Sequence, residues 1–137
     1  PFVGMEGLDN QPNLDRLSET KDSLIVVFFG ASWCPLCPPE LMKLNRVQNQ
    51  FSEHNIATFF ISLDTNKKVL TNFIEPFSFP CYSDFKSWDS KIARDYHIAL
   101  TPSIFVLDHE LKIILKPKNI EQLIAWVNWN FSNVKTD

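Results

Sequence analysis

Two cysteines three positions apart, Cys34 and Cys37, stand in the stretch Ser-Trp-Cys-Pro-Leu-Cys-Pro-Pro-Glu at residues 32–40. Thiols at this spacing can close a disulfide, trade electrons with another pair of sulfurs, or supply half of a zinc site. Three prolines and one acid, Glu40, surround the pair. This stretch is the first place to look for chemistry.

The zinc alternative needs more ligands than the stretch supplies. Zinc normally takes four ligands, and the sequence has neither a second CxxC nor a closely spaced histidine pair. The missing ligands would have to be recruited from Cys81, His54, His97 and His109. The ligand count therefore favours a redox dithiol, and thiol exchange requires no metal or organic cofactor.

A strand and a helix are expected to hold the two cysteines. Leu24–Phe29 is a short apolar run rich in β-branched residues, which is typical of a strand buried on both faces of a sheet. Apolar residues then recur at helical spacing from Pro35 to about His54. The carboxyl end of a strand and the amino end of a helix favour a site, and the helix dipole stabilises a thiolate there. By position, Cys34 is the better nucleophile.

The prolines predict an irregular start to this helix. Pro35 suits a first helical turn, because its missing N–H would be unpaired there anyway. Pro38 and Pro39, however, cannot donate to the carbonyls of Cys34 and Pro35 if the helix begins at Cys34. We expect those carbonyls to be left to water or to a substrate backbone. Residues three apart on a helix have Cβ atoms roughly 5–6 Å apart, and a disulfide needs about 3.8 Å, so a slight tightening would close the bond.

The rest of the chain predicts an α/β fold. We expect a strand at 56–63, a helix at 66–74 capped by Asp64 or Thr65, a short strand within 77–84, a short helix at 89–96, a hairpin of strands 103–107 and 111–115, and a helix from Ile120 to about Phe131. Parallel strands need crossover helices, so this order predicts a central mixed β-sheet flanked by helices on both faces.

Length and charge limit the possible partners. The 137 residues, 45% of them hydrophobic, suit one globular domain. A net charge of −3 without a Lys/Arg cluster argues against nucleic acid or an anionic membrane as partner. No apolar run approaches the roughly 18 residues of a membrane span. We expect a monomer.

We place the folded domain at residues 23–132, with residues 1–22 as an N-terminal extension or the start of the domain and residues 133–137 as a C-terminal tail. The chain begins at Pro1 rather than Met, so we expect a signal peptide, anchor or further domain before it. Three cysteines are too few for a disulfide scaffold, and composition alone leaves the compartment open.

Two motifs carry a family resemblance. Trp33-Cys-Pro-Leu-Cys37 after an apolar strand, with Tyr96-His-Ile-Ala-Leu-Thr-Pro102 before a hairpin and a final helix, resembles the thioredoxin superfamily across nearly the whole chain. The long segment between the second strand and Thr101-Pro102 resembles the inserted βα unit of TlpA/ResA-like thiol-disulfide oxidoreductases and the related peroxiredoxins. Peroxiredoxins need a Pro and a Thr where this chain has Val27 and Ala31, which disfavours peroxidase chemistry.

The resemblance implies a substrate site beside the dithiol. Pro102 is expected to be cis and next to Cys34, with the Thr101 backbone free to pair with an extended substrate peptide. The alternative is an ordinary trans proline opening an edge strand. Trp33, Pro35 and Leu36 are expected to shape the same substrate face.

Glu40 stands three residues after Cys37, where ResA-like proteins carry an acid. There it would relay the proton that Cys37 loses, provided that partial burial raises its pKa. The alternatives are a solvated acid favoured by the helix dipole and direct transfer to water. Phe28 occupies the position of the buried aspartate of thioredoxins, so that position cannot handle the proton.

Other reactive or aromatic residues are expected to be structural. Cys81 follows a proline in an apolar context and is interpreted as a buried inert thiol. His97 is interpreted as a surface or packing residue rather than a catalytic base. The remaining tryptophans, Trp88, Trp126 and Trp129, are assigned to packing.

The resulting hypothesis is thiol-disulfide exchange with a disulfide-containing protein, in which Cys34 attacks and Cys37 resolves the mixed disulfide. By resemblance, the protein is a reductant outside the cytoplasm of a bacterium, in the periplasm or anchored to a membrane, and receives electrons from a membrane thiol carrier. A non-catalytic interaction module on the same scaffold and a thiol peroxidase-related protein remain alternatives.

Overall fold

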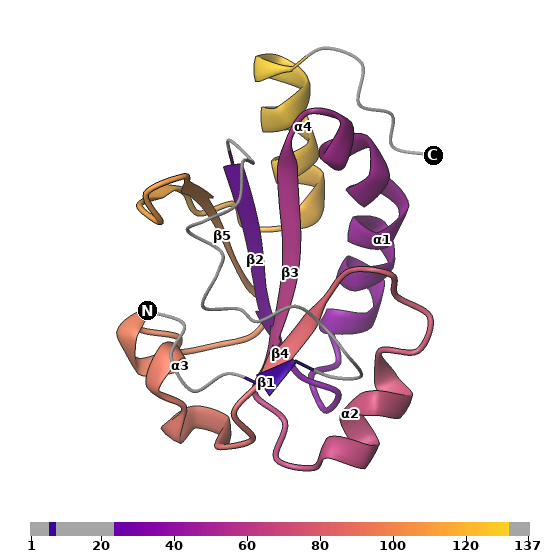
Figure 1. The fold of residues 1–137 in the computed structure, drawn as a ribbon, viewed down its shortest axis with the longest axis vertical. Coiled ribbons are helices and arrows are strands. Elements are labelled where there is room, and N and C mark those ends of the chain that lie inside the picture. Colours follow the sequence, from indigo (N-terminus) through magenta and orange to yellow (C-terminus); the bar gives the residue numbers. More distant parts are fainter. Residues whose placement is uncertain (1–5, 8–23, 132–137) are drawn as a thin grey trace.

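The computed structural model describes residues 6–7 and 24–131, which build a mixed sheet covered by helices (Figure 1). Within these residues the sheet has six strands in the order β1-β4-β3-β2-β5-β6. The strands are β1 (Glu6–Gly7), β2 (Leu24–Gly30), β3 (Ile56–Ser62), β4 (Cys81–Ser83), β5 (Ser103–Asp108) and β6 (Ile113–Leu115). The α-helices are α1 (Cys37–Glu53), α2 (Lys67–Phe73), α3 (Lys91–Asp95) and α4 (Ile120–Asn130). The predicted α/β architecture is confirmed.

The central strand β2 determines where the site lies. It pairs in parallel with β3, with Gly30 opposite Ser62, and antiparallel with β5, with Phe29 opposite Ser103. The carboxyl ends of β2 and β3 and the amino end of β5 therefore meet at one edge of the sheet. The CxxC loop, the residues after β3 and the Thr101-Pro102 loop all emerge there.

Both faces of β2 are buried, because its side chains alternate between two apolar clusters. Val26 and Phe28 pack in a cluster with the apolar faces of α1 and α4. Ile25, Val27 and Phe29 pack on the opposite face, in a cluster that includes Ile92 of α3 and residues of β5. Figure 1 shows α1 and α4 on one side of the sheet and α3 on the other. The continuous apolar run of β2 thus reflects burial on both sides.

The predicted start of the long helix is wrong by two residues. The helix begins at Cys37, so Pro38 and Pro39 occupy its first turn, where an N–H has no intrahelical acceptor in any case. Pro35 lies in a turn before the helix rather than in its first turn. The expected irregular segment is present, but the Cys34 carbonyl is not free, because it accepts from the Cys37 N–H at 3.3 Å.

The cap of α2 also differs from the prediction. Asn66, rather than Asp64 or Thr65, caps the helix by accepting from the Val69 N–H at 3.0 Å. The Asp64 carboxylate binds Ser32 instead. The acid therefore binds the loop after β2 instead of capping α2.

The tryptophans are less buried than expected. Trp126 is partly buried against the cluster beneath α1 and α4. Trp129, however, is 89% exposed and Trp88 is 43% exposed, so the packing assignment is wrong for both. Trp88 lies on a short 3-10 helix, Ser87–Asp89, between β4 and α3.

The inserted unit supplies β4, which extends the sheet beyond β3. The strand β1 pairs antiparallel with β4, so Glu6–Gly7 belongs to the same sheet as residues 24–131. The proposed extension, residues 1–22, otherwise lies outside the described residues, as does the proposed tail, residues 133–137.

The tight packing of β2 against α1 makes Gly30 sensitive to substitution. A Cβ at Gly30 would lie 2.8 Å from Cys37 Sγ and 3.0 and 3.2 Å from the rings of Phe28 and Phe60. We expect Gly30→Ala to lower the free energy of unfolding by about 1–3 kcal/mol, because these neighbours are buried and must shift. Urea unfolding of the oxidised protein measures this loss, and an unchanged midpoint would contradict the packing described here.

Candidate functional site

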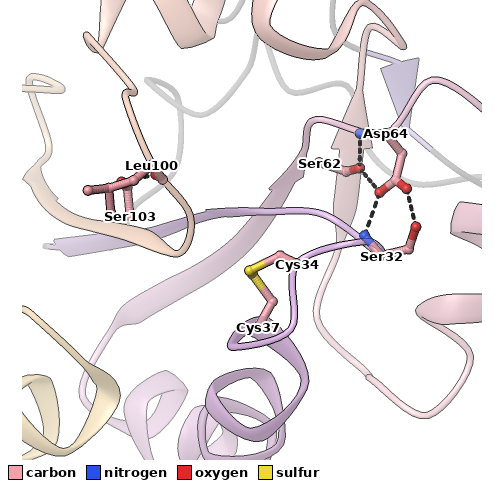
Figure 2. Close-up of a disulfide and its surroundings, with 7 residues drawn as sticks. All are labelled: Ser32, Cys34, Cys37, Ser62, Asp64, Leu100 and Ser103. Atoms are coloured by element: carbon pink, nitrogen blue, oxygen red, sulfur yellow. Dashed lines mark hydrogen bonds between the residues drawn. A yellow bond between two sulfur atoms is a disulfide. The ribbon is translucent and has the colours of Figure 1, made fainter.

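A disulfide joins Cys34 and Cys37, with 5.4 Å between their Cα atoms. Figure 2 shows it between the loop after β2 and the first turn of α1. Cys37 is fully buried, whereas Cys34 keeps 2% of its surface exposed. Its neighbours Trp33 and Leu36 are 49% and 63% exposed. A partner approaching from solvent therefore meets the Cys34 side of the bond first.

The amino end of α1 provides favourable electrostatics for a thiolate. Cys37 is the first residue of this 17-residue helix, and Cys34 lies just before it. The positive end of the helix dipole lies at this point, although Pro38 and Pro39 have no N–H and the Cys37 N–H already donates to the Cys34 carbonyl. When the bond is reduced, this end of the helix stabilises negative charge on sulfur.

The Thr101-Pro102 peptide bond is cis, as the resemblance implied. The loop leads into β5 and is braced by the Ser103 hydroxyl, which donates to the Leu100 carbonyl at 2.7 Å (Figure 2). Among the described residues, no turn or loop hydrogen bond engages the Thr101 backbone.

A pocket of about 390 Å³ lies between this loop and the start of α1. It is lined by Leu36, Pro39, Glu40, Lys43, Leu100, Thr101, Pro102, Lys118 and Asn119. Four residues singled out from the sequence, Leu36, Glu40, Thr101 and Pro102, thus share one cavity. Trp33 and Pro35 are not among its lining residues. Pro102 lines this pocket together with Leu36, Pro39 and Glu40 from the start of α1.

Glu40 is largely buried and bridges two helices, which rules out a fully solvated acid. Its side chain is 13% exposed, and Oε1 accepts from the Ile120 N–H at the start of α4 at 3.3 Å. Oε2 lies 3.3 Å from Lys43 Nζ, but this buried atom has no well-formed hydrogen bond among the described residues. A hydrogen bond to Glu121, together with the nearby carboxylate of Glu40, raises the pKa of Lys43. One Glu40 oxygen therefore retains capacity for a further donor or proton.

The sequence did not indicate that Trp88 pairs with Trp33. Their ring centroids are 5.9 Å apart, and both rings stay substantially exposed. Phe85 and Ser87, which flank the turn, have positive φ angles of 59° and 52°. Such angles are unfavourable for residues other than glycine and are often found at functional sites. The polar residues on either side of Trp88 were the available sign of an exposed turn.

Asp64 is a second residue that the sequence reasoning missed as part of the site. It is 2% exposed and accepts a hydrogen bond from the Ser32 N–H, two residues before Cys34. The available signal was an acid directly after a buried strand next to the strand of the CxxC. Phe28, by contrast, is fully buried in an edge-on contact with Phe60, so its position carries no proton-handling group.

The other reactive side chains do not assemble into a site. Within the described part of the chain, no three His, Cys, Asp or Glu residues are arranged to hold a metal ion. Cys81 is fully buried, and burial, assisted by the charge of Asp64, raises the pKa of its thiol. None of the helices in the described ranges has the length and apolar character to span a bilayer.

Residues 4–116 match the model of the AhpC/TSA family. Sporulation thiol-disulfide oxidoreductase A of Bacillus subtilis is 26% identical over 77% of this chain and 67% of its own length. Thiol-disulfide oxidoreductase ResA of Bacillus cereus is 22% identical over 74% of this chain and 58% of its own.

Solved structures agree on the fold. A thiol-disulfide oxidoreductase from Bacteroides fragilis has a TM-score of 0.73 at 25% identity, covering 80% of this chain and 82% of its own. The thioredoxin domain of a Bacteroides vulgatus thiol-disulfide oxidoreductase has a TM-score of 0.77 at 22% identity, covering 97% and 96%. This chain therefore belongs to the AhpC/TSA family of thioredoxin-like proteins, and the two Bacillus relatives above are named thiol-disulfide oxidoreductases.

Proposed function

We propose that this protein reduces disulfides in protein substrates through the Cys34 and Cys37 pair. The observation that carries the proposal is the disulfide at the amino end of α1, with Cys34 2% exposed, Cys37 fully buried and a mainly apolar pocket alongside. The family match and the names of its relatives support the same reaction class.

The exchange proceeds in two displacements. The Cys34 thiolate attacks a substrate disulfide, which forms a mixed disulfide and releases one substrate thiolate. The Cys37 thiolate then attacks the Cys34 sulfur, closes the intramolecular bond and releases the second substrate thiolate. Both released thiolates take up protons, and two electrons have passed to the substrate. An external dithiol must then reduce the Cys34–Cys37 bond to complete the cycle.

The reductant role and its setting rest on resemblance. CxxC couples span roughly −270 to −120 mV, so the motif alone does not fix the direction. The similarity to a ResA protein supports a reductant. On the same basis we place the protein outside the cytoplasm of a bacterium, with a membrane thiol carrier as its electron donor. We also propose that residues 23–132 form a catalytic domain that acts as a monomer.

The substrate side of the proposal uses the surface around the disulfide. An extended segment would pair with the Thr101 backbone beside Pro102. Leu36 would contact the residue that enters the pocket, and Pro35 and Trp33 would line the exposed face. Four large apolar side chains exposed near the disulfide support this surface, namely Trp33, Leu36, Trp88 and Leu100.

Peroxidase chemistry is less well supported. Val27 and Ala31 are buried aliphatic residues at the positions where peroxiredoxins need a Pro and a Thr, so no hydroxyl stands there to bind a peroxide. A non-catalytic interaction module would leave the cysteine pair, Trp33 and the cis proline without a role.

We expect Cys34→Ser to abolish insulin reduction by the dithiothreitol-reduced protein, because the attacking sulfur is lost. Cys37→Ser should instead accumulate a mixed disulfide with the substrate, since the resolving thiol is missing. Cys81→Ala is the matched control and should keep activity, because the Cys81 thiol is buried. Wild-type protein that fails to reduce insulin would leave the interaction module as the better interpretation.

Glu40 is proposed to accept the Cys37 proton through Oε2, the carboxylate oxygen that has no well-formed hydrogen bond among the described residues. We expect Glu40→Gln to slow insulin reduction roughly tenfold near neutral pH, below the ~10²-fold typical of a positioned base, because water can replace it. The dependence of the rate on pH should also differ from that of the wild type. Lys43→Gln removes the ion pair with Glu40 but keeps the carboxylate, so it shows whether loss of this ion pair alone slows the reaction. A Glu40→Gln profile identical to wild type would eliminate the relay.

Trp88 is proposed to contact substrates together with Trp33. An aromatic contact contributes about 0.5–1.5 kcal/mol, so Trp88→Ala should raise the KM for insulin about three- to tenfold with kcat unchanged. Reduction of a small aromatic disulfide should not change. Trp129→Ala removes an indole that is 89% exposed on α4 and serves as control. Equal effects of the two variants would refute a specific role for Trp88.

A further inference from the structure

Asp64 is a buried carboxylate that the proposed exchange does not use. It lies just after β3, and its side chain collects three hydrogen bonds (Figure 2). Oδ2 accepts from the Ser32 N–H at 3.0 Å and from the Ser62 hydroxyl at 2.5 Å, and Oδ1 accepts from the Ser32 hydroxyl. The Asp64 N–H donates back to the Ser62 hydroxyl at 2.8 Å.

The burial of the Asp64 carboxylate depends on the hydrogen bonds that it accepts. A buried charge is costly unless it is paired or hydrogen-bonded. Within residues 24–131, no Lys, Arg or His forms an ion pair with Asp64. Hydrogen bonds to an ionised acceptor are roughly twice as strong as neutral ones. Asp64 therefore holds Ser32 firmly against the end of β3.

Ser32 connects Asp64 to the loop at 31–36, which contains Cys34. It stands two residues before Cys34, in a turn closed by the Cys34 N–H donating to the Ala31 carbonyl at 3.2 Å. Just before the turn, the Leu63 N–H donates to the Gly30 carbonyl at 2.8 Å. Among the described residues, the bonds between Ser32 and Asp64 are the only hydrogen bonds that involve a side chain of the loop at 31–36 or reach that loop from another side chain.

The charge of Asp64 also acts on the buried thiol of Cys81 at this end of the sheet. It adds to burial in raising the pKa of the Cys81 thiol. Cys81 belongs to the same apolar cluster as Cys34 and Cys37. A fixed negative charge disfavours a thiolate, so it opposes the effect of the α1 amino end.

We propose that Asp64 is a positioning residue that fixes the Cys34 loop through Ser32 and makes the Cys34–Cys37 couple more reducing. The inference rests on the exchange proposed above. Thiolate stabilisation favours the reduced dithiol and makes a couple more oxidising. A neighbouring negative charge has the opposite effect. Glu40, Lys43 and Lys118, which line the adjacent pocket, stay unchanged in every variant used below.

The effect of the Asp64 charge is tested by equilibrating the protein with glutathione. In this reaction the protein disulfide and two glutathione thiols give the protein dithiol and glutathione disulfide. We expect Asp64→Asn to shift this equilibrium constant about tenfold toward the dithiol, which corresponds to about 30 mV for a two-electron couple. Cys34 should also react faster with iodoacetamide at pH 7. An unchanged equilibrium constant would overturn the proposal.

The positioning is tested with serine variants. Ser32→Ala should lower kcat/KM for insulin about tenfold, because a loosened loop misplaces the attacking sulfur. Ser32→Thr, which keeps the hydroxyl, should restore most of it. Ser83→Ala is the matched control, since the buried Ser83 hydroxyl donates to the Ser62 carbonyl and accepts from the Phe85 N–H, and forms no hydrogen bond with the loop at 31–36. Equal losses of kcat/KM in Ser32→Ala and Ser83→Ala would mean that any buried hydroxyl in this region has the same effect, which would overturn the proposal.

The serine variants decide the matter if Asp64→Asn does not fold. Failure of the proposed function would look different. Wild-type protein would then equilibrate with glutathione but leave insulin oxidised, and the shift of the glutathione equilibrium in Asp64→Asn would still test the role of Asp64.

Discussion

The parallel pairing of β2 with β3 is the constraint on which the site depends. It places Gly30 opposite Ser62, and a slip of one residue would turn every side chain of β2 to the other face. In the observed register, the missing side chain of Gly30 leaves room for the Cys37 sulfur. The same register sets the loop of Ser32 beside Asp64. Core packing and site geometry are therefore set by one set of backbone hydrogen bonds.

Two acids flank the dithiol from different elements, and their surroundings suit different roles. Glu40 lies on the pocket wall, has a nearby cation in Lys43 and keeps one oxygen without a well-formed hydrogen bond. Asp64 lies behind the loop, and both of its oxygens accept hydrogen bonds. A proton acceptor needs spare capacity and access, whereas an anchor needs saturated bonds. This contrast is the basis on which we propose proton transfer at Glu40 and positioning at Asp64.

Local patterns predicted the fold because each main element has its own signal. The apolar run of β2 and the helical spacing in α1 identified the elements that carry the cysteines, whereas the cis bond before β5 was implied by the family resemblance. The site was only partly predictable, since its missed residues act over long separations. Asp64 binds Ser32 across 32 residues, and the ring of Trp88 meets that of Trp33. Such contacts appear only once the strand order is known.

The surface around Cys34 is asymmetric, and this asymmetry bears on substrate choice. The exposed ring pair of Trp33 and Trp88 offers flat aromatic faces. The pocket instead offers the aliphatic side chains of Leu36 and Leu100, with polar groups among its lining residues. Flat rings accept many apolar side chains, whereas a bounded pocket discriminates by size. Under the exchange that we propose, selectivity among protein disulfides should therefore depend more on the residue that enters the pocket than on the one that contacts the rings.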